Sequence, residues 1–269
     1  VHRSTRGWSY GASVRDPRTG EILKGHVSLG SLRVRQDYLI AQGLLQPFED
    51  GKPTDKRMLE LAVARLKQLS AHEIGHTIGL AHNFAASSVG RASVMDYPYP
   101  LIKQDIEGNL DLNSAYDNKI GVWDKWAITY GYGYPPEGVD ETSYLTKALQ
   151  DTYHAGYEFI TDTDARDSSG VHPRSHLWDN GGSAAGELKR MLALRETRMA
   201  SFNLNAIPFG QPEATLEEVF VPLYLMHRYQ LEATAKLIGG MDYSYKIKGD
   251  NQPNQSWITA AIQQESLDA

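Results

Sequence analysis

The feature that most constrains this chain is the segment AHEIGHTIGLAH at residues 71–82. His72 and His76 are four residues apart, so on a helix they share one face and their imidazoles can converge on one ion. Gly79 relaxes the restriction on φ and lets the chain turn sharply out of that helix, which brings His82 back as a third ligand. The segment therefore predicts a helix that ends in a tight turn and a metal held by three histidines.

Three protein ligands are typical of a catalytic zinc site, because they leave a fourth position for water or substrate. Glu73 follows the first ligand directly, where its carboxylate can reach a water on the metal without binding the metal itself. We therefore expect one zinc ion per chain, with Glu73 as the general base.

Composition excludes several other chemistries. The chain has no cysteine, which rules out disulfides, thiolate metal ligands and cysteine nucleophiles. Its net charge is −6 and it carries no long basic run, so we expect no nucleic-acid partner. Apolar stretches stay well short of the ~20 residues that span a bilayer, so we expect no membrane span.

The first part of the chain alternates strand and helix signals. Two strands are expected around Trp8–Tyr10 and Ile22–Leu29, joined by the turn residues of segment 16–20. A helix is expected over residues 33–45. A longer one, over residues 56–79, follows the break at Gly51-Lys52-Pro53 and is capped by Thr54 or Asp55.

The second part of the chain reads as mainly helical. We place a boundary at the Gly- and Pro-rich segment 131–136, which separates a catalytic region (1–135) from a C-terminal region (136–269) that packs on it or extends it. Pro222 predicts a kink or a later start in the last long helix. The expected helices cover residues 120–130, 144–149, 184–199, 215–238 and the end of the chain from residue 257.

A second motif makes the resemblance to known proteins specific. Met95 lies thirteen residues after His82, within the segment SVMDY at 93–97. A long zinc motif followed by a methionine in a tight turn resembles the metzincin clan. The resemblance implies that Met95 packs beneath the three histidines as a hydrophobic floor. It also implies an α+β zincin fold, with a small sheet and a long zinc-binding helix before a mainly helical C-terminal half, and a cleft between the upper and lower halves.

Individual metzincin families extend this resemblance to the substrate side of the site. In astacins and serralysins a tyrosine two residues after the methionine contacts the zinc or the oxyanion, and Tyr97 holds that position here. In matrix metalloproteinases the chain after the turn forms a wall of the specificity pocket, which implies a substrate contact at Tyr99. A substrate would lie extended along a strand edge. We assign that edge to Gly25–Ser31, with Val27 and Leu29 as substrate-binding residues.

The broadest resemblance is to large secreted bacterial zinc proteases of poorly characterised type. It rests on segments 16–21, 82–84, 93–97 and 177–181, and it implies a secreted or periplasmic location. Only 71 residues precede His72, fewer than in most metzincins. We therefore expect the first strand and first helix of the sheet half to be missing from this chain, which begins without methionine.

These observations predict a zinc-dependent endopeptidase that acts on protein or peptide substrates, with its oligomeric state left open. Two alternatives stay open, a catalytically silent metal-binding scaffold and a zinc amidase with a non-protein substrate. The aspartates at 162, 164 and 167 resemble a calcium loop, but their spacing departs from the EF-hand pattern and favours a polar loop. His172 and His176 are four apart, but Pro173 argues against the helix that a second metal site would need there.

Overall fold

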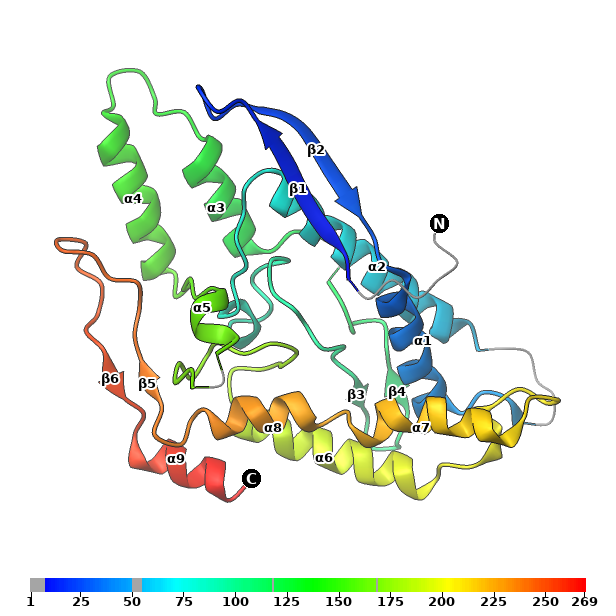
Figure 1. Cartoon of the computed structure of the whole chain (residues 1–269). Coiled ribbons are helices and arrows are strands. Elements are labelled where there is room, and N and C mark those ends of the chain that lie inside the picture. The colour runs from blue at the N-terminus through cyan, green and yellow to red at the C-terminus, as the bar shows by residue number, and fades with distance from the viewer. Residues whose placement is uncertain (1–7, 50–54, 118, 168) are drawn as a thin grey trace. The chain divides into compact units, whose positions relative to one another are not determined.

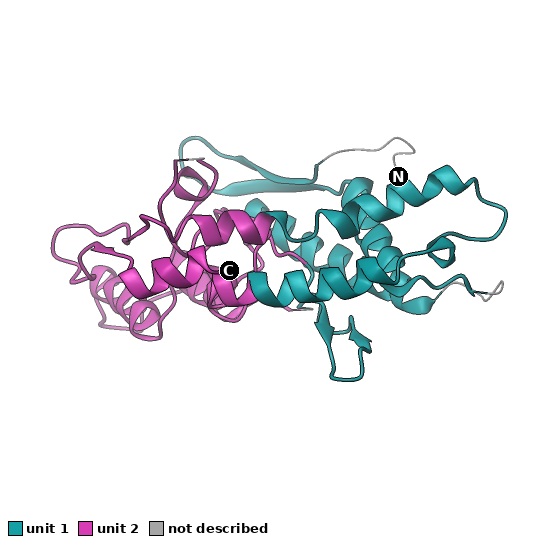
Figure 2. Cartoon of the chain, turned by 90° about the horizontal axis from the view of Figure 1, so that it is seen from below, with its two compact units in different colours: residues 1–78, 100–118, 188–228 teal, residues 79–99, 119–187, 229–269 magenta. Residues whose placement is uncertain are grey.

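The computed structural model describes residues 8–49, 55–117, 119–167 and 169–269. The chain divides into two compact units, each assembled from three separate stretches (Figure 2). Unit 1 comprises the described parts of residues 1–78, 100–118 and 188–228, and unit 2 those of residues 79–99, 119–187 and 229–269.

A β-hairpin opens unit 1 (Figure 1). Strand β1 (Tyr10–Arg15) pairs antiparallel with β2 (Ile22–Ser28), with Tyr10 opposite Ser28. The turn closes through the Asp16 N–H, which donates to the Glu21 carbonyl at 2.9 Å, and Gly20 adopts a φ of 76° that favours glycine. The predicted hairpin is therefore confirmed, with the correction that its first strand runs over Tyr10–Arg15 and not around Trp8–Tyr10.

The expected edge strand Gly25–Ser31 was wrong at its C-terminal end. Strand β2 stops at Ser28, and helix α1 (Ser31–Leu45) begins three residues later. The Gly30 N–H donates to the Ser9 hydroxyl at 2.8 Å instead of joining a strand ladder. This side-chain contact turns the chain out of the sheet and into the helix.

Helix α2 (Lys56–Thr77) is the long helix that the sequence predicted. Asp55 caps it by accepting the Arg57 N–H at 2.9 Å, while Thr54, the other predicted cap, and the predicted break at 51–53 lie outside the described residues. The apolar residues of α2 recur at helical spacing and pack against α1, and β1 and β2 pass over the same helix. The buried side chains of this core are Ile40, Ala41, Leu44, Met58, Leu61, Ala62 and Leu69.

Helix α7 (Leu216–Tyr224) packs on α1 and completes the core of unit 1. The single helix expected over 215–238 is instead interrupted at residues 225–227, and α8 (Arg228–Ala235) follows. Pro222 lies in the last turn of α7, and the N–H that it lacks would bond the carbonyl of Glu218, so its direct effect falls on the turn before it. Unit 1 also contains the short strands β3 (Lys103–Gln104) and β4 (Leu110–Asp111) and the 3₁₀ turns Leu204–Ala206 and Glu213–Thr215.

Unit 2 is built from short helices and irregular segments. Helices α3 (Val122–Tyr132) and α4 (Glu141–His154) pack against each other, and Trp123 stacks on Phe159 with ring centroids 5.5 Å apart. Unit 2 also contains the 3₁₀ turn Ala86–Ser88, α5 (Asp162–Ala165), the strand β5 (Met241–Asp242) paired with β6 (Ser256–Trp257), and α9 (Ala260–Leu267). Helix α6 (Ala184–Ala200) begins in unit 2 and continues into unit 1.

The fold class is α+β, as predicted, because helices dominate and the sheets are small and antiparallel. Among the described residues no helix is both long and apolar enough to cross a membrane. The sequence boundary at residue 135, between regions 1–135 and 136–269, stays a prediction.

Candidate metal centre

Helix α2 places two histidines side by side near its C-terminal end. The Nε2 atoms of His72 and His76 lie 3.1 Å apart, and their rings meet edge to face with centroids 4.7 Å apart. Two nitrogens that bind one tetrahedral zinc ion at about 2.0–2.1 Å are roughly 3.3 Å apart. The two imidazoles therefore have the separation that a shared metal ion requires.

The third histidine follows the end of α2 in the same continuous segment. The helix stops at Thr77, and Gly79 adopts a φ of 92°, a left-handed conformation that side chains rarely tolerate. His72, His76 and His82 each offer a ring nitrogen within 4.8 Å of the other two. Three neutral imidazoles form a donor set that fits zinc and leaves a coordination position open.

Glu73 lies between the two helical histidines in sequence and is only 4% exposed. Burial raises the pKa of Glu73 to about 7, against the opposing effects of the Gly11 N–H, which bonds its carboxylate, and of the Arg65 charge. A carboxylate with a pKa near neutrality is suited to take and return a proton.

Gly11 lets strand β1 approach α2 unusually closely at this point. A Cβ added to Gly11 would lie 1.9 Å from the Glu73 carbonyl oxygen. A Cβ added to Gly25 on β2 would likewise lie 3.1 Å from the Thr77 Cβ. The sequence signalled neither contact, since a glycine inside a strand pattern indicates only that another backbone comes near.

His82 is held by an acidic residue far along the chain. Its Nδ1 lies 2.7 Å from Oδ2 of Asp162, at the start of α5. Burial alone would raise the pKa of Asp162, but hydrogen bonds from Arg166 and His82 outweigh burial and hold that pKa below its ordinary value. Sequence reasoning noticed Asp162 only as part of a polar loop, and nothing in the local pattern connects it with His82.

The segment that carries Met95 is fixed through its backbone. Met95 is fully buried, and its carbonyl accepts the Asn83 N–H at 3.1 Å, directly after His82. The Ser93 hydroxyl accepts the Met95 N–H at 2.8 Å. Asp124, on the first turn of α3, in turn accepts from both the Ser93 hydroxyl and the Val94 N–H.

Tyr97 packs beside His82 within unit 2, with ring centroids 4.8 Å apart. The Tyr97 ring also stacks on Trp178, with ring centroids 5.0 Å apart, and the Trp178 N–H donates to the Tyr97 carbonyl at 2.8 Å. The Arg166 guanidinium lies 5.1 Å from the Tyr97 ring centroid. Sequence reasoning placed neither Trp178 nor Arg166 at Tyr97, because each comes from a distant segment; segment 177–181 entered only as part of the resemblance.

The predicted substrate-binding residues have different surroundings. Tyr99 is only 7% exposed, and its carbonyl accepts the Asn180 amide at 3.0 Å. Val27 is half-buried in β2 opposite Gly11, whereas Leu29 lies beyond the end of β2 and is 38% exposed. Their contacts with a substrate stay predictions.

The order of the three histidines, Glu73 and Met95 along the chain has a counterpart among known families. Residues 54–269 match the family model described as Met-zincin. The chain belongs to the Met-zincin family. No curated protein and no solved structure matches this Met-zincin chain.

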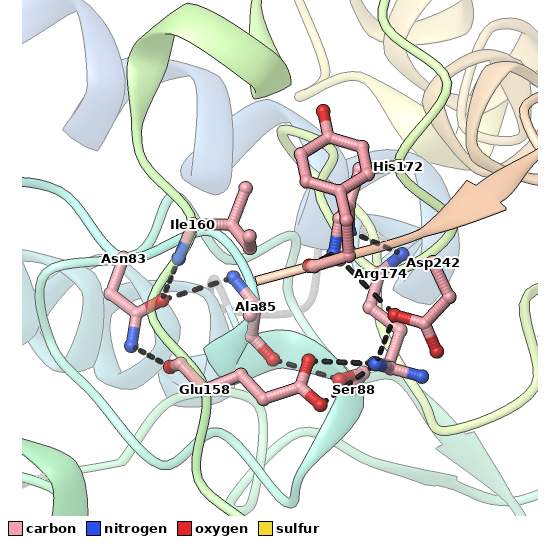
Figure 3. A network of polar contacts seen from close by, with 9 residues as sticks. Asn83, Ala85, Ser88, Glu158, Ile160, His172, Arg174 and Asp242 are labelled. Atoms are coloured by element: carbon pink, nitrogen blue, oxygen red, sulfur yellow. Dashed lines mark hydrogen bonds and ion pairs between the residues drawn. The ribbon is translucent and has the colours of Figure 1, made fainter. Parts of the chain in front are cut away.

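A second group of potential ligands in this Met-zincin comprises Glu158, His172 and Asp242, whose ligand atoms lie within 4.8 Å of one another. Arg174 already contacts both carboxylates, at 2.7 Å each (Figure 3). His172 is fully buried, and burial lowers its pKa to about 4. Because one guanidinium bridges the two carboxylates, we interpret the group as an ion-pair network.

The three aspartates that resembled a calcium loop are bonded to protein donors. Asp162 accepts from Arg166 and His82, Asp164 from the hydroxyls of two tyrosines, and Asp167 from Ser169. The described part of this loop therefore gives no support for calcium and matches the polar-loop alternative.

Proposed function

We propose that this chain is a zinc-dependent endopeptidase that uses Glu73 as its general base. The observation that carries the proposal is the convergence of His72, His76 and His82, with Glu73 next to the first of them and buried. Membership of the Met-zincin family supports the same chemistry. The secreted or periplasmic location implied by the resemblance stays a prediction.

Each residue has a defined task in this proposal. His72, His76 and His82 would hold zinc, which supplies a Lewis acid that polarises a peptide carbonyl and lowers the pKa of a bound water to about 7. The Glu73 carboxylate accepts the proton of the attacking water and later delivers it to the leaving amine. The Tyr97 hydroxyl donates to the oxyanion, which exists only near the transition state and therefore benefits from a donor already in place.

An extended peptide substrate would bind along the outer edge of β2. This strand pairs with β1 on one side, and Gly25 brings it close to Thr77 at the end of α2. Backbone groups along such an edge can add a further strand, so binding would depend on the peptide backbone more than on any one side chain.

The first experiment is elemental analysis of the chain and of a His76→Ala variant. We expect about one zinc per chain in the wild type and a large loss in the variant, because three-histidine sites need every ligand. Wild-type protein that binds no zinc when prepared without chelator would contradict the proposal.

The second experiment tests the base with Glu73→Gln. We expect the variant to keep its zinc and to lose roughly 10²–10⁴ in kcat on a peptide library, because glutamine cannot accept the proton. Near-normal peptide cleavage by this variant would rule out Glu73 as the base. Cleavage of non-peptide amides alone would favour the amidase, and zinc binding without any turnover would favour the silent scaffold.

A further inference from the structure

We propose that Asp162 is a positioning residue for the third ligand His82, and that Arg166 holds Asp162 and Tyr97 in place from the same turn. The proposal rests on the proposed zinc site and adds two residues to it. Neither residue binds the metal in this arrangement.

The first step concerns the orientation of the His82 ring. Its Nδ1 lies 2.7 Å from the Asp162 carboxylate, and the pair is only partly exposed, at 14% for the histidine side chain. A carboxylate at Nδ1 selects the tautomer that donates from that nitrogen, so Nε2 carries the lone pair that faces the metal. The same contact prevents the ring from flipping and makes the imidazole a more basic ligand.

The second step concerns what holds the carboxylate. Arg166 donates from Nε to Oδ1 of Asp162, while Oδ2 faces His82, so the two oxygens serve two partners. The two residues are four apart and span the short helix α5. On the other side of the turn, the Tyr245 hydroxyl accepts the Thr161 N–H at 3.0 Å and donates to Asp164.

The third step concerns the hydrogen bonds between the chain next to His82 and the chain next to Asp162. The buried Asn83 side chain donates to the Glu158 carbonyl at 2.8 Å and accepts the Ile160 N–H at 3.2 Å (Figure 3). The Phe84 N–H also donates to the Ile160 carbonyl, at 2.8 Å. The two residues after His82 are therefore bonded to residues two and four positions before Asp162, which limits the distance between the two side chains.

The fourth step concerns the contact between Arg166 and Tyr97. The Arg166 guanidinium lies 5.1 Å from the centroid of the Tyr97 ring and 5.7 Å from that of Phe84. Arg166 thus bonds the residue that orients His82 and covers the ring proposed as oxyanion donor. One arginine couples the geometry of a ligand to that of a catalytic side chain.

The test compares Asp162→Ala, Asp162→Asn and Arg166→Lys in the full chain, with Asp167→Ala as matched control. Asp167 lies in the same loop, and among the described residues its side chain bonds only to Ser169. The zinc dissociation constant is measured by competition with a chromophoric chelator, and the visible spectrum of the cobalt-loaded protein reports the ligand geometry. Urea unfolding of the metal-free variants shows whether each one folds.

We expect Asp162→Ala to weaken zinc binding roughly 10–100-fold and to change the cobalt spectrum. Asp162→Asn keeps an oxygen acceptor, so its affinity should lie between those of Asp162→Ala and the wild type. Arg166→Lys should alter the cobalt spectrum with a smaller loss of affinity, and Asp167→Ala should match the wild type in both measurements.

Two results would overturn the inference in distinguishable ways. If wild-type protein binds zinc and folded Asp162→Ala binds it equally well with an unchanged cobalt spectrum, the positioning role is wrong and the proposed function stands. If the wild type binds no zinc, both proposals fail. Equal losses in Asp162→Ala and Asp167→Ala would mean that the loop acts only through general stability.

Discussion

At the scale of single residues, the candidate site includes a close backbone contact besides its candidate ligands. Gly11 allows β1 to lie against α2 so closely that any side chain would overlap the Glu73 carbonyl, at 1.9 Å. The same residue donates its N–H to the Glu73 carboxylate. One glycine thus places a strand over Glu73, the proposed base, and gives its carboxylate a hydrogen-bond partner.

This contact predicts the effect of Gly11→Ala. The new methyl group forces β1 away from α2, so we expect a loss of roughly 1–3 kcal/mol in the free energy of unfolding, typical of overpacking, and a lower kcat. Urea unfolding and peptide turnover measure the two effects.

Gly131→Ala is the matched control for that change. Gly131 lies inside α3 with nothing within 4 Å of its added Cβ, so alanine should stabilise the chain by about 0.5–1 kcal/mol. A Gly11→Ala variant that behaves like Gly131→Ala would show that β1 does not pack on Glu73 as described.

At the scale of elements, the first turn of α3 fixes the segment that carries Met95. The Asp124 carboxylate accepts the Gly121 N–H at its own helix terminus and the Val94 N–H at 2.9 Å. It is 1% exposed, so a lost partner could not be replaced by bulk water. A helix cap and a turn at the candidate site therefore share one side chain.

Asp124→Ala should lower the free energy of unfolding by more than the loss of an ordinary helix cap does. We expect a loss of roughly 2–4 kcal/mol in the free energy of unfolding, because buried donors remain without an acceptor. Asp140→Ala is the control, since Asp140 caps α4 through the Ser143 N–H at 2.9 Å in an exposed position, where a loss of about 0.5–2 kcal/mol is usual. Equal losses measured by urea unfolding would mean that Asp124 is only a helix cap.

The helices and strands also show which elements the sequence pattern alone can predict. The range 56–79 predicted for the long helix differs from Lys56–Thr77 by only two residues, because its apolar spacing and its cap are local signals. The hairpin was predicted for the same reason. The helix expected over 215–238 breaks at 225–227, three residues after Pro222. The helical sequence pattern continues through these residues, so it did not predict the turn.

At the scale of the whole molecule, a buried pair of carboxylates connects two distant segments of unit 2. Ser87 donates its N–H to Asp96 at 2.8 Å and its hydroxyl to Asp179 at 3.2 Å. Burial raises the pKa of Asp179 to about 7, and burial together with the nearby Asp179 raises the pKa of Asp96. Global stability should therefore depend on pH through these groups.

The sign of that dependence follows from the raised pKa. Between the ordinary aspartate pKa of about 3.9 and the folded value of about 7, the native chain holds a proton that the unfolded chain has lost. Each step up in pH within this window therefore lowers the free energy of unfolding, by at most ~1.4 kcal/mol per pH unit for Asp179. Above the folded pKa the contribution is constant.

Asp179→Asn removes this titration and nearly preserves the shape of the side chain. We expect the stability of the variant relative to the metal-free wild type to rise from about pH 4 to about pH 7 and then to level off. Buried His172 and His176 titrate with the opposite sign, but they are present in both proteins and cancel in the difference. Parallel stability curves for the two proteins in urea would contradict the prediction.

The sequence by itself determined the candidate ligands, the candidate base Glu73 and the order of Met95 and Tyr97 after them. Those inferences need only the period of a helix and the freedom of one glycine, which are properties of neighbouring residues. The tertiary structure alone decided that Asp162 lies at His82, 80 positions away, that Gly11 lies over Glu73, and that Asp124 holds the Met95 segment. Hydrogen bonds between distant segments leave no periodic trace in a single sequence, because either partner has the same local pattern whether or not the other is present.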